Sequence, residues 1–174
     1  MKFKAKLEQL DSSVWGQHII VPTKVSKKLI AETKNKRVIC NVNGEFSFHA
    51  ALMPKGDGIY FVNFSKQNSK KFGLIEGDML NIELVKDESK YGIPMPEEFQ
   101  ELLYQDVEGN ELFHALTPGK QRSLLHIIGT VKSPDIRIRK GLIMLNHLRS
   151  NKGKLDFRQL NQDFKTYKDT DFGF

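Results

Sequence analysis

Hydrophobic and polar residues alternate along the first ninety positions in the manner of β-strands. Phe3, Ala5 and Leu7 are separated by charged residues, a period of two that buries one face of a strand. Asn43-Gly44 is a two-residue signal for a tight hairpin turn. Similar runs predict strands at residues 15–21, 37–42, 46–52, 59–64 and 79–85, with short helical turns at 23–31 and 65–72. About six short strands at this spacing predict a small closed β barrel.

Beyond this region the hydrophobic positions take the period of helices. The segment Tyr91-Gly92-Ile93-Pro94-Met95-Pro96 predicts a linker, because two prolines in three residues disrupt both sheet ladders and helices. Thr117-Pro118 and Ser133-Pro134 are helix starts, and the second predicts a helix that reaches about Ser150. A last amphipathic helix is predicted at about 157–167. The predicted fold class is therefore α+β, with a barrel at 1–92, an all-helical domain at 94–174 and a C-terminal extension after about residue 151.

The composition is typical of a soluble protein from a reduced compartment. A chain of 174 residues that is 39% hydrophobic is large enough to bury a core in each domain. No apolar run approaches the roughly 18 residues of a membrane helix, and the N-terminus lacks the apolar stretch of a secretory signal. Cys40 is the only cysteine, which excludes an internal disulfide. We therefore expect a cytoplasmic protein that does not contact membranes.

Charge separates sharply within the helical region, although the net charge of the whole chain is only +6. Residues 97–111 hold six acidic and no basic residues, whereas residues 120–158 hold ten basic residues and two acidic ones. The basic stretch predicts a ligand-binding surface for an anion. Its candidate residues are Lys132, Arg137, Arg139, Lys140 and Arg122.

Arg137 has two interpretations. On a helix that starts at Pro134 it shares the apolar face with Met144 and Leu148, so its stem is predicted to be buried. Its guanidinium then either pairs with a carboxylate of the acidic segment or binds an anionic ligand near the helix N-terminus.

Two sets of motifs are similar to known domains. Val21-Pro22, Asn43-Gly44, Gly56-Asp57-Gly58 and Gly77-Asp78 resemble a small β-barrel domain of unknown function. Pro96-Glu97-Glu98-Phe99, Phe113-His114-Ala115-Leu116, Thr117-Pro118 and the run from Lys132 to Lys140 resemble the bacteriocin-protection, or YdeI/OmpD-associated, family. The resemblance implies a bacterial protein with the barrel before the helices and a protective phenotype, without an established chemistry.

The sequence contains few of the residue patterns that are typical of catalytic sites or metal-binding sites. The five histidines show no helical i, i+3 or i+4 pairing, no Gly-x-Ser-x-Gly motif is present, and Cys40 lies in an apolar run typical of a core position. We predict no catalytic residues, no metal site and no cofactor. A basic barrel face that includes Lys24, Lys34, Lys36 and Arg37, with Trp15 and His18 nearby, is either a nucleic-acid surface or a solvated face.

The leading functional hypothesis is a non-enzymatic binding or stress-protection protein whose partner is a small anionic ligand or a protein. The alternative is a nucleic-acid-binding regulator that uses the basic barrel face. A third hypothesis is an enzyme that acts on an anionic small molecule in a cleft between the domains.

Overall fold

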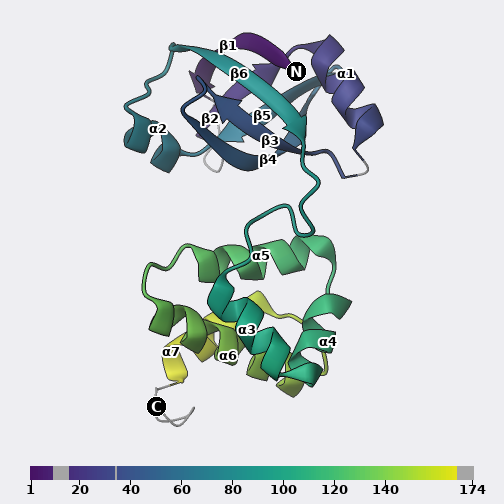
Figure 1. The fold of residues 1–174 in the computed structure, drawn as a ribbon, viewed down its shortest axis with the longest axis vertical. Coiled ribbons are helices and arrows are strands. Elements are labelled where there is room, and N and C mark those ends of the chain that lie inside the picture. Colours follow the sequence, from purple (N-terminus) through teal and green to yellow (C-terminus); the bar gives the residue numbers. More distant parts are fainter. Residues whose placement is uncertain (10–15, 34, 168–174) are drawn as a thin grey trace. The chain divides into compact units, whose positions relative to one another are not determined.

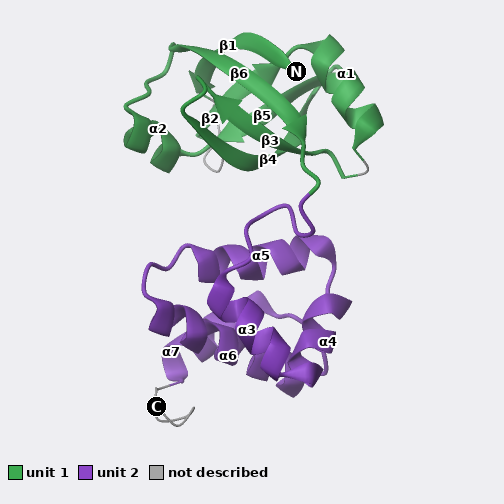
Figure 2. Cartoon of the chain, viewed as in Figure 1, with its two compact units in different colours: residues 1–88 green, residues 89–174 purple. Residues whose placement is uncertain are grey.

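Two compact units make up the chain, one formed by Met1–Glu88 and the other by Ser89–Phe174 (Figure 2). The computed structural model describes residues 1–9, 16–33 and 35–167. The first unit is a closed six-stranded barrel and the second consists of helices (Figure 1). The predicted α+β fold class, a barrel followed by helices, is confirmed.

The barrel strands follow the order β1-β2-β5-β4-β3-β6, and β6 pairs with β1 to close the sheet. Neighbouring strands are antiparallel throughout. The elements of this unit are β1 (Lys2–Gln9), β2 (Gln17–Val21), α1 (Thr23–Glu32), β3 (Arg37–Val42), β4 (Phe46–Gly56), β5 (Ile59–Phe64), α2 (Lys66–Phe72) and β6 (Met79–Lys86).

The strand predicted at 15–21 is observed from Gln17, and Trp15 lies outside the described residues. The strand predicted to end at residue 52 continues to Gly56, because its pairing with β5 extends that far.

Alternate residues along the strands fill the barrel interior. Leu7, Val38, Cys40 and Leu84 are fully buried there, and Leu29 of α1 packs into the same core. Burial raises the pKa of the Cys40 thiol to about 12. The thiol therefore stays protonated at neutral pH and acts as a small apolar side chain, as its position in the sequence predicted.

Two hairpin turns need backbone conformations that few residues adopt. Asn43 and Gly44, between β3 and β4, have φ angles of 54° and 74°. Asp57 and Gly58, between β4 and β5, have φ angles of 51° and 72°. Two successive positive φ angles are the signature of a type I′ turn, whose twist matches that of the flanking strands. The hairpin predicted at Asn43-Gly44 is confirmed.

The second unit contains five helices within the described residues. They are α3 (Glu97–Gln105), α4 (Val107–Ala115), α5 (Pro118–Gly129), α6 (Pro134–Ser150) and α7 (Phe157–Thr166). The helix starts predicted at Pro118 and Pro134 are confirmed, and α6 ends at Ser150 as predicted. The Ser133 hydroxyl caps α6 by accepting a hydrogen bond from the Ile136 N–H at 3.4 Å.

The segment before α3 packs with the helices. Tyr91, Ile93 and Met95 are partly buried against the core of the second unit, which is built around Phe99, Phe113 and the apolar face of α6. The prolines of this segment interrupt regular structure, but its alternate hydrophobic residues anchor it to the helical unit.

Helix α6 is the central helix of this unit, since it packs against all four of the others. Its approach to α3 depends on Gly141. A Cβ atom at Gly141 would lie 2.5 Å from Leu102 Cδ1 and 3.0 Å from Phe99 Cδ2. Phe99 is fully buried, so its ring has no free space into which it could move.

Gly141→Ala should therefore destabilise the helical unit by about 1–2 kcal/mol, because overpacking outweighs the gain in helix propensity. Gly119→Ala is the matched control, since nothing lies within 4 Å of a Cβ placed at that position of α5. The control should leave stability unchanged or raise it by up to about 1 kcal/mol. Urea denaturation followed by circular dichroism at 222 nm measures both, and equal stability of the two variants would contradict this account of the α3–α6 contact.

Candidate functional site: a polar groove on the barrel

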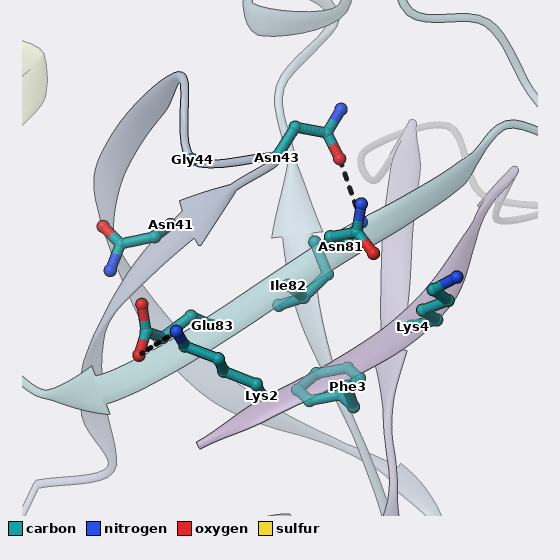
Figure 3. Close-up of a pocket in the computed structure, with 9 residues that line it drawn as sticks. All are labelled: Lys2, Phe3, Lys4, Asn41, Asn43, Gly44, Asn81, Ile82 and Glu83. Carbon is teal, nitrogen blue, oxygen red and sulfur yellow. Dashed lines mark hydrogen bonds and ion pairs between the residues drawn. The ribbon is translucent and has the colours of Figure 1, made fainter.

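A groove of about 470 Å³ opens on the barrel where β1, β6 and the β3–β4 hairpin meet (Figure 3). The residues that line it come from three separate stretches of the chain. They are Lys2, Phe3, Lys4, Asn41, Asn43, Gly44, Asn81, Ile82 and Glu83.

The strand alternation and register decide which side chains reach the groove. Phe3 and Ile82 are cross-strand partners whose side chains pack with the barrel core. The positions on either side of them therefore face outward, and the register places Lys2 opposite Glu83 and Lys4 opposite Asn81. Polar side chains gather here because the inward positions of the same strands are apolar.

The β3–β4 hairpin turn forms a third side of the groove, and Asn43 joins this turn to β6 through hydrogen bonds. The Asn43 N–H donates to the Asn81 carbonyl at 2.8 Å, and the Asn43 Oδ1 accepts from the Asn81 N–H at 2.9 Å. These bonds extend the β3–β6 ladder into the turn (Figure 3). The Asn43 Oδ1 is engaged by the bond from the Asn81 N–H, and no hydrogen bond found among the described residues uses the two donors on its Nδ2.

The groove carries a small excess of positive charge. Lys2 Nζ lies 3.9 Å from the carboxylate of Glu83, the one acidic residue in the lining. Lys4 is exposed, and no ion pair involves it among the described residues. Ammonium groups and amide N–H₂ groups are donors that suit the oxygen atoms of an anion. The residues that line the groove include no cysteine, serine or histidine.

The basic residues predicted as a ligand surface lie in the helical unit, and three of them have partners there. Arg137 Nη1 is 3.1 Å from Glu98 Oε1, and Arg137 Nε donates to the Val131 carbonyl at 2.7 Å. Arg139 donates to the Tyr167 carbonyl, and Lys140 Nζ lies 5.3 Å from the centre of the Phe164 ring. Lys132 is exposed, and Arg122 is half-buried on α5.

Of the two interpretations of Arg137, these contacts favour the ion pair within the fold. Glu98 belongs to the acidic segment, and its side chain is 17% exposed, compared with 28% for the Arg137 side chain. The guanidinium that could have received an anion is therefore already neutralised by α3.

The basic residues predicted on the barrel have different environments. Lys24 is exposed in the first turn of α1, Lys36 Nζ lies 5.4 Å from the centre of the Tyr60 ring, and Arg37 is half-buried at the start of β3. Lys34 lies outside the described residues.

His18, considered part of the same face in the sequence, is only 1% exposed. Burial, and then the Lys55 ammonium 3.0 Å from its Nε2, lower the pKa of His18. It is therefore a neutral, buried side chain and not a surface contact for nucleic acid.

Sequence reasoning missed the charged contact that is centred on Arg149. Its guanidinium donates to Asp106 and, from Nε at 3.1 Å, to Glu108. Asp106 also caps α4 by accepting from the Gly109 N–H at 2.8 Å. The sequence could have indicated Asp106 as the residue that caps α4. It could not have indicated that Asp106 binds Arg149, because the two are 43 residues apart and no local pattern links them.

The groove was missed for a similar reason. Its asparagines stand in ordinary strand and turn positions, and only the barrel closure brings them together with Lys2 and Lys4.

Fold and groove together describe a barrel-and-helix protein with a polar groove on the barrel. Residues 3–84 match the model of the domain of unknown function DUF1905. Residues 93–151 match the model of the family described as bacteriocin-protection, YdeI or OmpD-associated. The resemblance seen in the motifs is thus confirmed for both units. Neither the curated proteins nor the solved structures contain a significant match.

Within residues 1–9, 16–33 and 35–167, no group of three or more histidine, cysteine, aspartate or glutamate side chains could hold a metal ion. None of the helices in this described part of the chain has both the length and the apolar character that crossing a bilayer requires.

Arg137→Ala should destabilise the helical unit by about 1–3 kcal/mol, since it leaves the Glu98 carboxylate and the Val131 carbonyl without their partner. Adding Glu98→Gln to this variant should recover part of the loss, because the unpaired charge is then removed. Lys120→Ala, at an exposed position of α5, is the control and should change stability by less than about 0.5 kcal/mol. Urea melts of the four proteins measure these effects, and a double variant less stable than Arg137→Ala would contradict the pairing.

The Arg149 contact predicts a loss of stability in acid. Burial acts to raise the pKa of Asp106, but the hydrogen bonds from Arg149 and the Gly109 N–H outweigh it and hold the pKa below its ordinary value. A carboxyl with a depressed folded-state pKa adds stability above its unfolded pKa of about 3.9, and that stability disappears as the pH falls through the folded value.

Arg149→Met should therefore lower stability at pH 7 and flatten the dependence of stability on pH below about 4, relative to the unsubstituted protein. Urea midpoints measured between pH 2 and pH 7 test this. Parallel pH profiles of the two proteins would show that Arg149 does not set the Asp106 pKa.

Proposed function

We propose that the protein is a non-enzymatic binding protein whose barrel groove takes up an anionic, phosphate-bearing ligand. The observation that carries the proposal is the set of donors around the groove. The Lys4 ammonium and the Asn43 amide nitrogen take part in none of the ion pairs and hydrogen bonds found among the described residues, and both residues line the same groove of about 470 Å³.

The chemistry of the lining favours an anion. Lys2 is only loosely held by Glu83 at 3.9 Å and is 80% exposed, so it is free to turn toward a bound phosphate. Phosphate oxygens accept several hydrogen bonds at once, and lysine acts toward them as a point charge. Asn41 and Asn81 contribute further amide groups to the lining of the groove.

The family description supports a protective role in a broad sense. A protein that protects by binding needs a surface that sequesters or recognises a partner, and the groove supplies one. Under this proposal the helical unit, in which Arg137, Arg139 and Arg149 already have partners in the fold, supports the barrel instead of providing the primary anion site.

The test is a titration of the ¹⁵N-labelled full chain with sodium pyrophosphate and, separately, with a 12-nucleotide oligothymidylate. Binding in the groove should shift the side-chain amide signals of Asn41, Asn43 and Asn81. Lys4→Glu should weaken binding about tenfold or more, because it replaces a charge-assisted contact with a repulsive one. Lys70→Glu makes the same change in net charge on exposed α2 and should weaken binding less than about twofold.

The two probes separate the sources of the phosphate group. Binding of pyrophosphate alone indicates a small ligand, whereas binding of the oligonucleotide that weakens steeply with salt indicates a nucleic acid chain. Absence of any shift with both probes, or equal weakening by the two lysine variants, overturns the proposal.

A further inference from the structure

A second pocket, of about 280 Å³, lies within the helical unit and has different chemistry. It is bordered by the segment before α3, by α3 itself and by α4. The residues that matter are Lys90 and Tyr91 from the segment, Leu103 and Tyr104 from α3, and His114 from α4.

The polar side of the pocket is organised by His114. Its Nδ1 donates to the Asn110 carbonyl at 2.9 Å, because a carbonyl can only accept, and this leaves Nε2 as an acceptor. The Tyr91 hydroxyl lies 2.8 Å from Nε2 and donates to it. Lys90 Nζ is 3.5 Å from the same nitrogen and 5.1 Å from the centre of the Tyr91 ring. The side chains of Lys90, Tyr91 and His114 thus fix one another's positions on the polar side of the pocket.

The apolar side is formed by Leu103 and Met95, with Tyr104 at the edge. Leu103 is buried, whereas the Tyr104 side chain is 71% exposed. The Gln100 amide donates to the Tyr104 hydroxyl at 3.3 Å, which orients the ring from the preceding turn of α3. An exposed aromatic ring beside a pocket, held in place by a hydrogen bond, offers a stacking surface to a ligand.

The charge of the lining selects the kind of ligand. Lys90 is its one permanently charged group, and no carboxylate lines the pocket. A cationic ligand would compete with the Lys90 ammonium, which already lies over the Tyr91 ring. A volume near the lower end of the range for ligand sites leaves room for a single ring.

We propose that this pocket binds a monocyclic aromatic carboxylate. The ring packs on Leu103 and Met95 and stacks with Tyr104, while the carboxylate pairs with the Lys90 ammonium beside Tyr91 and His114. The site is independent of the barrel groove, because it shares no residue with it.

The probe is sodium benzoate, titrated into the ¹⁵N-labelled full chain. Its dissociation constant should be on the order of 1 mM or lower, as expected for a ligand of this size. The backbone amides of Lys90, Tyr91, Tyr104 and His114 should shift. Benzamide, which keeps the shape and lacks the charge, should bind about tenfold more weakly, and cyclohexanecarboxylate, which lacks the aromatic ring, at least threefold more weakly.

Lys90→Gln and Tyr104→Ala should each weaken benzoate binding about fivefold or more. Both positions are exposed, so neither change should disturb the fold. Lys120→Gln, an exposed lysine of the same unit, is the matched control and should stay within twofold.

The proposal is overturned if benzoate leaves these four amides unshifted, or if benzamide and benzoate bind equally. It is also overturned if Lys90→Gln and Lys120→Gln weaken binding alike. Shifts confined to residues 2–4, 41–44 and 81–83 would assign the carboxylate to the barrel groove, which counts against this site while leaving the proposed function intact.

Discussion

The register between β1 and β6 is the constraint on which the barrel unit depends. It closes the sheet, so that Leu7, Leu80 and Leu84 enter one core, and it sets Lys2 opposite Glu83 and Lys4 opposite Asn81. A slip of one residue would turn every side chain of β1 to the other face. The core would then receive lysines and the groove would lose them, so stability and the proposed binding surface have the same origin.

In the helical unit, two arginine–carboxylate contacts and one histidine–carboxylate contact join neighbouring helices around α6. Arg137 joins α6 to Glu98 of α3, Arg149 joins it to Asp106 and Glu108 at the start of α4, and His147 Nδ1 lies 2.7 Å from Asp163 of α7. The acidic and basic stretches that are separate in the sequence thus pair with each other in the folded helical unit. The acids of residues 97–111 and the bases of α6 are complementary surfaces of one fold. Several arginines of the basic stretch that suggested an anion site therefore already bind groups of the protein itself.

The sequence predicted the local structure well, because the signals for it are local. Asn43-Gly44 and Ser133-Pro134 mark their turn and helix start through the conformations that those residues prefer. The burial of His18 and the partner of Arg149 were not predictable, since both depend on residues far away in the sequence. The groove is the clearest case. Asn41, Asn43 and Asn81 form no motif, and they meet only because β3 and β6 pair.

The closure of the barrel also has a consequence for the order of folding. The strands β1 and β6 that complete it are separated by about 80 positions, whereas α3 and α4 in the helical unit are neighbours in sequence. Closing so long a loop carries a large entropic cost before any contact is gained, and domains rich in distant contacts fold slowly. During synthesis the edge of β1 that pairs with β6 stays unpaired until the ribosome has made β6. The alternating lysines on the outer face of β1 then keep this unpaired edge hydrated and discourage its pairing with other chains.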